Sequence, residues 1–208
     1  MSITSPTPKA AAARREGVVL LAGMVALMWL INLINAADSY RLDSDGLYAH
    51  NVDRIWGIFT APFLHASWSH LIGNTIPLVF MGLLIALTGA RQFVGVTLIV
   101  IVLGGLGTWL VSPGGTQVVG ASGLVFGYAT YLLTRGFFDR SALEILTGIV
   151  VGVIFGGVLL ASLVPHGGIS WQGHLCGGIA GVIAAWLLSG DRRAAAKRAG
   201  TPGSALAR

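Results

Sequence analysis

Six long apolar runs divide this 208-residue chain, and they limit its possible folds more than any other feature. Most approach the roughly 20 residues that an α-helix needs to cross a hydrocarbon core. With 54% hydrophobic and only 10% charged residues, the chain is too apolar for a water-exposed globule. The runs cover residues 18–36, 69–89, 93–112, 122–137, 142–163 and 171–189. We therefore predict an all-α membrane protein with six transmembrane helices, its membrane domain spanning residues 17–190 between tails at 1–16 and 191–208.

The basic residues are distributed unevenly between the two sides of the predicted membrane. Of the 13 lysines and arginines, only Arg41 and Arg54 fall on the side of the first connecting loop. By the positive-inside rule, both termini are then cytoplasmic, and the protein lies in the cell (inner) membrane. The net charge of +5 follows from this topology and from attraction to anionic lipid, so we predict a lipid-bilayer partner and no nucleic-acid partner.

Two loops on the predicted outer side differ from the apolar runs in composition. The large loop between helices one and two, residues 37–68, combines aspartates with many aromatic side chains. This density indicates either a loop half sunk in the membrane interface or an ordinary aromatic belt. The loop before helix four, residues 112–121, is rich in glycine. We expect it to dip into the membrane, where non-helical backbone is tolerated only if protein or a water-filled cavity surrounds it.

Polar side chains in the apolar runs are few, and their cost in hydrocarbon makes them candidates for function. The span interiors contain no aspartate or glutamate, which argues against an aspartyl protease and against a Ser-His-Asp triad. The chain has no His-Glu-x-x-His motif and no Cys/His cluster with metal-ligand spacing, so we predict no metal site. A serine and a histidine remain: Ser122 at the start of run four and His174 near the start of run six.

The sequence around Ser122 suits a nucleophile inside a membrane. Gly120 and Gly123 allow the backbone to approach closely on either side of the serine. The unpaired N–H groups at a helix start can also stabilise developing negative charge. Counted from the predicted cytoplasmic helix ends at ~1.5 Å per residue, Ser122 and His174 lie about 20 and 26 Å into the membrane. A dyad is therefore possible, although Gly-x-Ser-Gly alone is also typical of tight helix contacts.

Two further patterns accompany this pair. His70 and Asn74 are four residues apart, so they project from one face of helix two and could donate hydrogen bonds to an oxyanion. Alternatively, they satisfy each other or a loop carbonyl. In helix six, Gly177 and Gly181 belong to a row of small residues that favours close helix packing. Such packing would bring His174 against the helix of the serine.

Together these residues resemble the rhomboid intramembrane serine proteases over about residues 50–190. The resemblance rests on the Trp56 to His65 segment, the His70/Asn74 pair, the Gly-x-Ser-Gly motif and Gly-His174 with its glycine row. It implies a Ser122 nucleophile, a His174 base and an oxyanion site that includes His70 and Asn74. Further positions are assigned to support or substrate binding: Gly120, Gly123, Phe126, Trp56, Gly177 and Gly181. The implied substrates are single-pass or multi-pass membrane proteins, with no cofactor or metal.

The chain departs from the family pattern at two positions. Gly57 follows Trp56 where relatives often carry an arginine, a role that Arg54 could take. Phe126 occupies a position where tyrosine is common, and its ring can still stack on His174. Two other functions stay open: an inactive rhomboid-like binder of membrane proteins and a small-solute transporter. Glycines in the fifth run, such as Gly156, indicate either a gate or simple packing.

Overall fold

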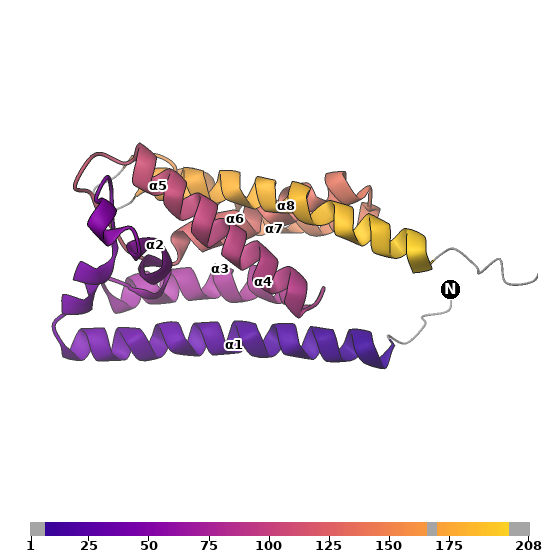
Figure 1. Ribbon diagram of the computed structural model, residues 1–208, viewed down its shortest axis with the longest axis horizontal. Helices are drawn as coiled ribbons and strands as arrows, with labels where there is room; N and C mark the ends of the chain where they lie inside the picture. The colour runs from indigo at the N-terminus through magenta and orange to yellow at the C-terminus, as the bar shows by residue number, and fades with distance from the viewer. Residues whose placement is uncertain (1–6, 166–169, 200–208) are drawn as a thin grey trace, which may run out of the picture.

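The computed structural model describes residues 7–165 and 170–199, and its long helices form a bundle (Figure 1). The long helices are α1 (Pro8–Ala37), α3 (Trp68–Ala86), α4 (Ala90–Ile99), α5 (Gly105–Val111), α6 (Ser122–Asp139), α7 (Ala142–Ala161) and α8 (Trp171–Ala199). A π-helical segment, η4 (Val100–Gly104), joins α4 to α5. The shorter elements are η1 (Arg41–Asp45), β1 (Leu47–Tyr48), η2 (Val52–Arg54), α2 (Gly57–Thr60), η3 (Ala61–Phe63) and β2 (Gln117–Val118).

Each of the six predicted runs coincides with a helix, and the first helix begins ten residues before its run. Helix α1 begins at Pro8, because proline suits a first helical turn and the Thr7 side chain caps it by accepting a hydrogen bond from Ala10 N–H. Part of the predicted tail 1–16 is therefore helical. Helix α8 likewise extends to Ala199, into the other predicted tail. Residues 1–6 and 200–208 of these tails lie outside the described residues.

Five helices in the described ranges are long and apolar enough to cross a membrane: α1, α3, the continuous helix from Ala90 to Val111, α7 and α8 up to Ser189. Helix α6 is not among them. It contacts α8, α7 and α3, and most of its side chains are buried, including Tyr128, Tyr131 and Arg135. A helix enclosed by its neighbours needs no continuous aliphatic surface, because little of it would face lipid. The count of six membrane spans therefore stays a prediction.

Helices α6 and α8 pack closely through glycines. A Cβ atom on Gly177 would collide with the backbone of Gly123, and one on Gly181 would collide with Gly127 O and the Thr130 hydroxyl. Thr130 Oγ1 also donates a 2.7 Å hydrogen bond to Gly178 O across the same interface. The small residues thus permit two backbones to approach to a distance that any larger side chain would prevent.

The loop after α1 is folded, and it is paired to the loop before α6. Strands β1 and β2 are antiparallel, with Leu47 opposite Val118 and Tyr48 opposite Gln117. These elements gather at one end of the bundle in Figure 1, whereas the first turn of α1 and the last turn of α8 lie at the other. The loop that leads to Ser122 is therefore paired with the loop that follows α1.

Helix α7 packs closely against α6 at its start and leaves open space beside Gly156 in its later half. At the start, Glu144 forms an ion pair with the buried Arg135 of α6, and a Cβ atom on Gly148 would lie 2.8 Å from Leu132 O. Nothing lies within 4 Å of a Cβ atom built at Gly156. The side of α7 that carries Gly156 therefore has no close neighbour among the described residues.

Candidate active site

A cavity of about 380 Å³ brings together the four residues on which the predicted chemistry depends. Ser122 of α6, His174 of α8, and His70 and Asn74 of α3 all line it. Phe126 and the later half of α7 contribute apolar walls. Three helices that are distant in sequence therefore present a hydroxyl, two imidazoles and an amide to one space.

Ser122 is the first residue of α6, and the backbone before it requires glycine. Gly120 has φ of +115°, a conformation that other residues rarely adopt. A Cβ atom at Gly120 would lie 2.6 Å from the His70 ring and 3.4 Å from Asn74 Nδ2. The loop that leads to the serine therefore lies directly against both predicted oxyanion residues.

The loop between α1 and α3, called here the outer loop after its predicted side, accepts hydrogen bonds from the N–H groups just before the serine. Gly120 N–H donates to Ala61 O at 2.8 Å, and Ala121 N–H donates to His65 Nε2 at 3.3 Å. The first helical hydrogen bond of α6 comes from Val125 N–H. The N–H groups from Ser122 to Leu124 therefore have no helical acceptor, as expected at a helix start. These are the donors that remain for a ligand at the serine.

His65 was part of the sequence resemblance but had no predicted role. Its side chain is fully buried, and burial, helped by the charge of nearby His70, lowers its pKa to about 4. His65 is thus neutral near pH 7, which it must be to accept the hydrogen bond from Ala121. Its position within the predicted loop 37–68 gave no indication of this contact.

The imidazole of His174 is fixed by a hydrogen bond and a ring stack. Its Nδ1 lies 2.8 Å from Ser162 O, and its ring stacks on Phe126 at 4.4 Å with an interplanar angle of 8°. Since a carbonyl can only accept, Nδ1 carries the proton and Nε2 keeps a lone pair. The predicted stacking on Phe126 is confirmed. The role of Ser162 was missed, because any residue can offer a carbonyl.

The serine and histidine share the cavity wall without a direct hydrogen bond between them among the described residues. Such contacts are often long in ligand-free enzymes and shorten when substrate binds. Asn74 Nδ2 is buried and has no partner in the described part of the chain. An unpaired buried donor is costly unless a ligand or water binds it, so Asn74 is poised to receive an acceptor.

Trp56 lies apart from these residues. It is 42% exposed in the outer loop, does not line the cavity, and stacks against the Arg54 guanidinium at 5.4 Å. Arg54 also pairs with Asp45 at 3.1 Å. An arginine at Gly57 would not fit, because its Cβ atom would collide with Gly46 O and lie 2.8 Å from Leu47 Cα. Arg54 therefore supplies the guanidinium beside Trp56.

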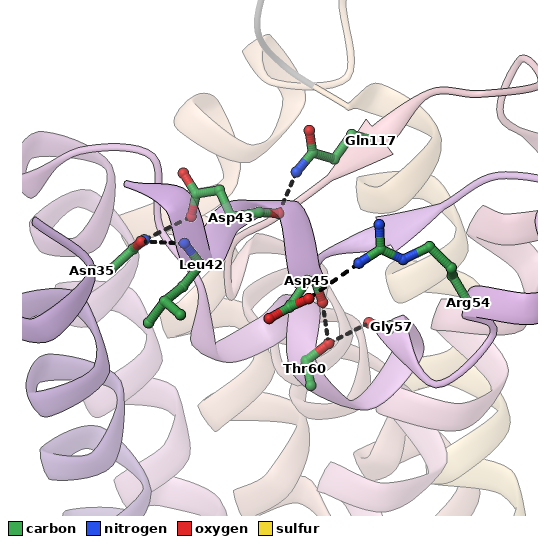
Figure 2. A network of polar contacts seen from close by, with 8 residues as sticks. All are labelled: Asn35, Leu42, Asp43, Asp45, Arg54, Gly57, Thr60 and Gln117. Atoms are coloured by element: carbon green, nitrogen blue, oxygen red, sulfur yellow. Dashed lines mark hydrogen bonds and ion pairs between the residues drawn. The ribbon is translucent and has the colours of Figure 1, made fainter. Parts of the chain in front are cut away.

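Gln117, five residues before the serine, does not line the cavity either. Its side chain instead donates a hydrogen bond to the backbone carbonyl of Asp43 (Figure 2). Gln117 thus joins the loop before the serine to the outer loop.

Comparison with known proteins gives the family. An uncharacterized protein of Mycobacterium tuberculosis is 48% identical over 186 residues, which are 85% of this chain and 78% of its own. Rhomboid-like protein 11, chloroplastic, of Arabidopsis thaliana is 33% identical over 159 residues, 67% of this chain and 55% of its own. YdcA of Bacillus subtilis, named as a candidate rhomboid protease, is 25% identical over 176 residues, 82% of this chain and 87% of its own. The family model of the Rhomboid domain matches residues 52–191, well over half of the chain. This multi-pass membrane protein therefore belongs to the rhomboid family.

Proposed function

We propose that this protein is an intramembrane serine endopeptidase that cleaves transmembrane segments of membrane proteins with a Ser122–His174 dyad. The observation that carries the proposal is the single cavity lined by the serine, the oriented histidine base and the unpaired Asn74 amide. Acyl transfer needs a nucleophilic hydroxyl, a base with a free lone pair and an unused hydrogen-bond donor in one partly enclosed space. Membership of the rhomboid family supports the same conclusion.

In the acylation step, His174 Nε2 takes the proton from Ser122 Oγ as that oxygen attacks the scissile carbonyl carbon. The carbonyl π electrons move to the oxygen, which becomes an oxyanion. Asn74, His70 and the N–H of Ser122 are the donors for this charge. His174 then gives its proton to the departing amine, and the peptide bond breaks.

In the deacylation step, water attacks the acyl-enzyme while His174 again acts as the base, and Ser122 is released. Ser162 O keeps the proton on Nδ1 of His174 throughout, so Nε2 stays available. In a three-residue triad a carboxylate has this orienting role. Here a neutral carbonyl fills it, and no permanently charged carboxylate has to be buried beside the histidine.

The proposed membrane arrangement has six spans in the inner membrane, with α6 as the enclosed fourth span and both termini in the cytoplasm. The cavity then opens toward the extracytoplasmic side. Substrates with small, helix-destabilising residues near that side should be cleaved best, because an extended peptide must reach Ser122. Reporter fusions at the two tails should both read as cytoplasmic, and a tail on the opposite side would reject this arrangement.

The test is cleavage of a single-pass substrate by the full chain reconstituted in liposomes. Ser122→Ala and His174→Ala should each lower kcat by as much as ~10⁶-fold, the scale measured when a catalytic serine or histidine is removed. Ser69→Ala and His50→Ala are the matched controls, because both residues are exposed and lie outside the cavity. The controls should cleave normally. Undiminished cleavage by Ser122→Ala would eliminate the proposed mechanism.

The alternative function is an inactive binder of membrane proteins, which the lack of a direct Ser122–His174 hydrogen bond would suit. A fluorophosphonate probe separates the two functions, since it bonds covalently only to an activated serine. The endopeptidase should react at Ser122, and the reaction should disappear in His174→Ala. A binder would retain its client and leave the probe unreacted.

A further inference from the structure

One face of α3 borders the active-site cavity over about two helical turns. The residues on this face are His70, Gly73, Asn74 and Pro77, and all four line the cavity. Their spacing of i, i+3, i+4 and i+7 is that of a single helical face. His70 and Asn74 are the proposed oxyanion donors, whereas Gly73 and Pro77 have no part in the mechanism described above.

Pro77 leaves the carbonyl of Gly73 without its helical donor. In an α-helix the C=O of one residue accepts a hydrogen bond from the N–H four residues later, and proline has no N–H. Pro77 lies inside α3, which continues to Ala86. Gly73 O is therefore a backbone acceptor with an open hydrogen-bonding position on the cavity side of the helix.

The polar side chains next to Gly73 do not replace the missing donor. The hydroxyl of Thr75 donates a 2.7 Å hydrogen bond to Leu71 O instead. Asn74 Nδ2 has no partner in the described part of the chain. Gly73 has no side chain, and a Cβ atom built on it would meet nothing within 4 Å. Gly73 therefore borders open space.

An unused donor and an unused acceptor thus lie on adjacent residues of one cavity wall. The donor is the amide of Asn74, which is 8% exposed, and the acceptor is the carbonyl of Gly73. In a membrane-spanning helix, an unmet backbone group is costly and is tolerated where it faces protein or a water-filled cavity. A peptide unit offers one C=O and one N–H, so an extended main chain matches this pair of groups.

We propose that Gly73 O, kept free by Pro77, binds the substrate main chain by accepting a hydrogen bond from one of its N–H groups. The inference rests on the proposed endopeptidase function. A transmembrane segment that unwinds to reach Ser122 exposes N–H groups that have lost their helical acceptors. Gly73 O supplies an acceptor for one of them, so the complex closes a hydrogen-bonding gap in both partners.

Pro77→Ala tests the proposal, because it restores an N–H that pairs with Gly73 O inside α3. Binding is measured as the Kd of a synthetic single-pass peptide for the full chain in liposomes, in a Ser122→Ala background that prevents cleavage. We expect Pro77→Ala to raise this Kd about threefold to tenfold, the range of one net hydrogen bond. Proline is the least favourable residue in a helix interior, so the thermal midpoint of unfolding should not fall.

The matched control is Ile76→Ala. Ile76 adjoins Pro77 on α3, is 64% exposed and does not line the cavity. The substitution shortens a neighbouring side chain of the same helix and leaves Gly73 O without a donor, as in the wild type. It should leave the Kd unchanged.

N-methylated peptides identify the donor on the substrate. Each peptide carries one N-methyl group at a successive position near the cleavage site, and this group removes a single main-chain N–H. At the position that donates to Gly73 O, methylation should raise the Kd of the protein that retains Pro77 and have a smaller effect, or none, in Pro77→Ala. Steric effects of the methyl group act on both proteins and cancel in the comparison.

Two results would overturn the proposal. One is an equal Kd with and without Pro77→Ala. The other is an N-methyl effect that is the same in both proteins at every position, since Pro77 would then act through packing, or Gly73 O would bind water. Wild-type protein that neither cleaves the peptide nor reacts with the fluorophosphonate would instead refute the endopeptidase function. The Kd comparison, made with Ser122→Ala protein, would still decide whether Gly73 O binds a peptide.

Discussion

The interface between α6 and α8 gives the sharpest prediction, because it sets the separation of the serine and the histidine. Gly177 lies one turn after His174, and a Cβ atom there would be 2.9 Å from both Cα and C of Gly123, which follows Ser122. These are backbone atoms and cannot rotate away. Gly177→Ala must therefore push the two helices apart at the level of the dyad.

The size of the effect follows from these distances. Ordinary van der Waals contact begins at 3.4 Å, so the backbones must separate by at least about 0.5 Å, the difference from 2.9 Å. Because a 1 Å misplacement of reacting groups can cost ~100-fold in rate, we expect Gly177→Ala to lower kcat roughly tenfold. Overpacking of this kind should also lower the free energy of unfolding by about 1–3 kcal/mol.

The assay is kcat for a single-pass substrate in liposomes, measured together with the thermal midpoint of unfolding. Gly178→Ala is the control, since its Cβ atom would lie 3.4 Å from the Thr130 methyl group, an ordinary contact. It should leave kcat and the midpoint close to wild type. If Gly177→Ala kept the wild-type kcat, the argument that this seam sets the dyad geometry would be refuted.

Two other predictions concern stability and substrate access. The pKa of His65 falls from 6.5 to about 4 on folding, so the unfolded chain binds more protons than the folded chain between these pH values. The free energy of unfolding should therefore drop as the pH decreases through this window. The total decrease should be about 3 kcal/mol. Denaturation at several pH values should reveal this slope in the wild type, and His65→Gln should remove it. Gly156→Leu should change the cleavage rate without loss of stability, because the new side chain meets open space. Gly148→Leu should instead destabilise the fold, because its side chain would collide with Leu132 O. An unaltered rate in Gly156→Leu would count against movement of α7 as the substrate entrance.

Hydropathy predicted the helices well and their ends poorly. All six runs correspond to helices, because burial in lipid or protein selects apolar residues over a full helix length. The start of α1 at Pro8 was missed, since its first turns are rich in alanine and charge and resemble a tail by hydropathy. Helix α6 was also predicted as a helix, but its burial among other helices allows it to contain Tyr128 and Arg135, so it does not meet the length and hydropathy expected of a span.

The sequence intervals between residues predicted part of the site. The interval between His70 and Asn74 places both on one face, and the glycine row of α8 predicts the close seam. Contacts made by backbone atoms were not predictable, such as Ser162 O beneath His174. The partners of Asp43 were also hidden, since Asn35 and Gln117 are distant in sequence and meet only after the outer loop has folded.

The origin of His174 in α8 has a consequence for biosynthesis. The proposed nucleophile precedes its base by 52 residues along the chain. A nascent polypeptide that has completed α6 still lacks the His174 imidazole, and it lacks the glycines that bring the two backbones together. Until residues up to Gly181 have left the ribosome and settled beside α6, the emerging chain has no complete copy of the proposed dyad.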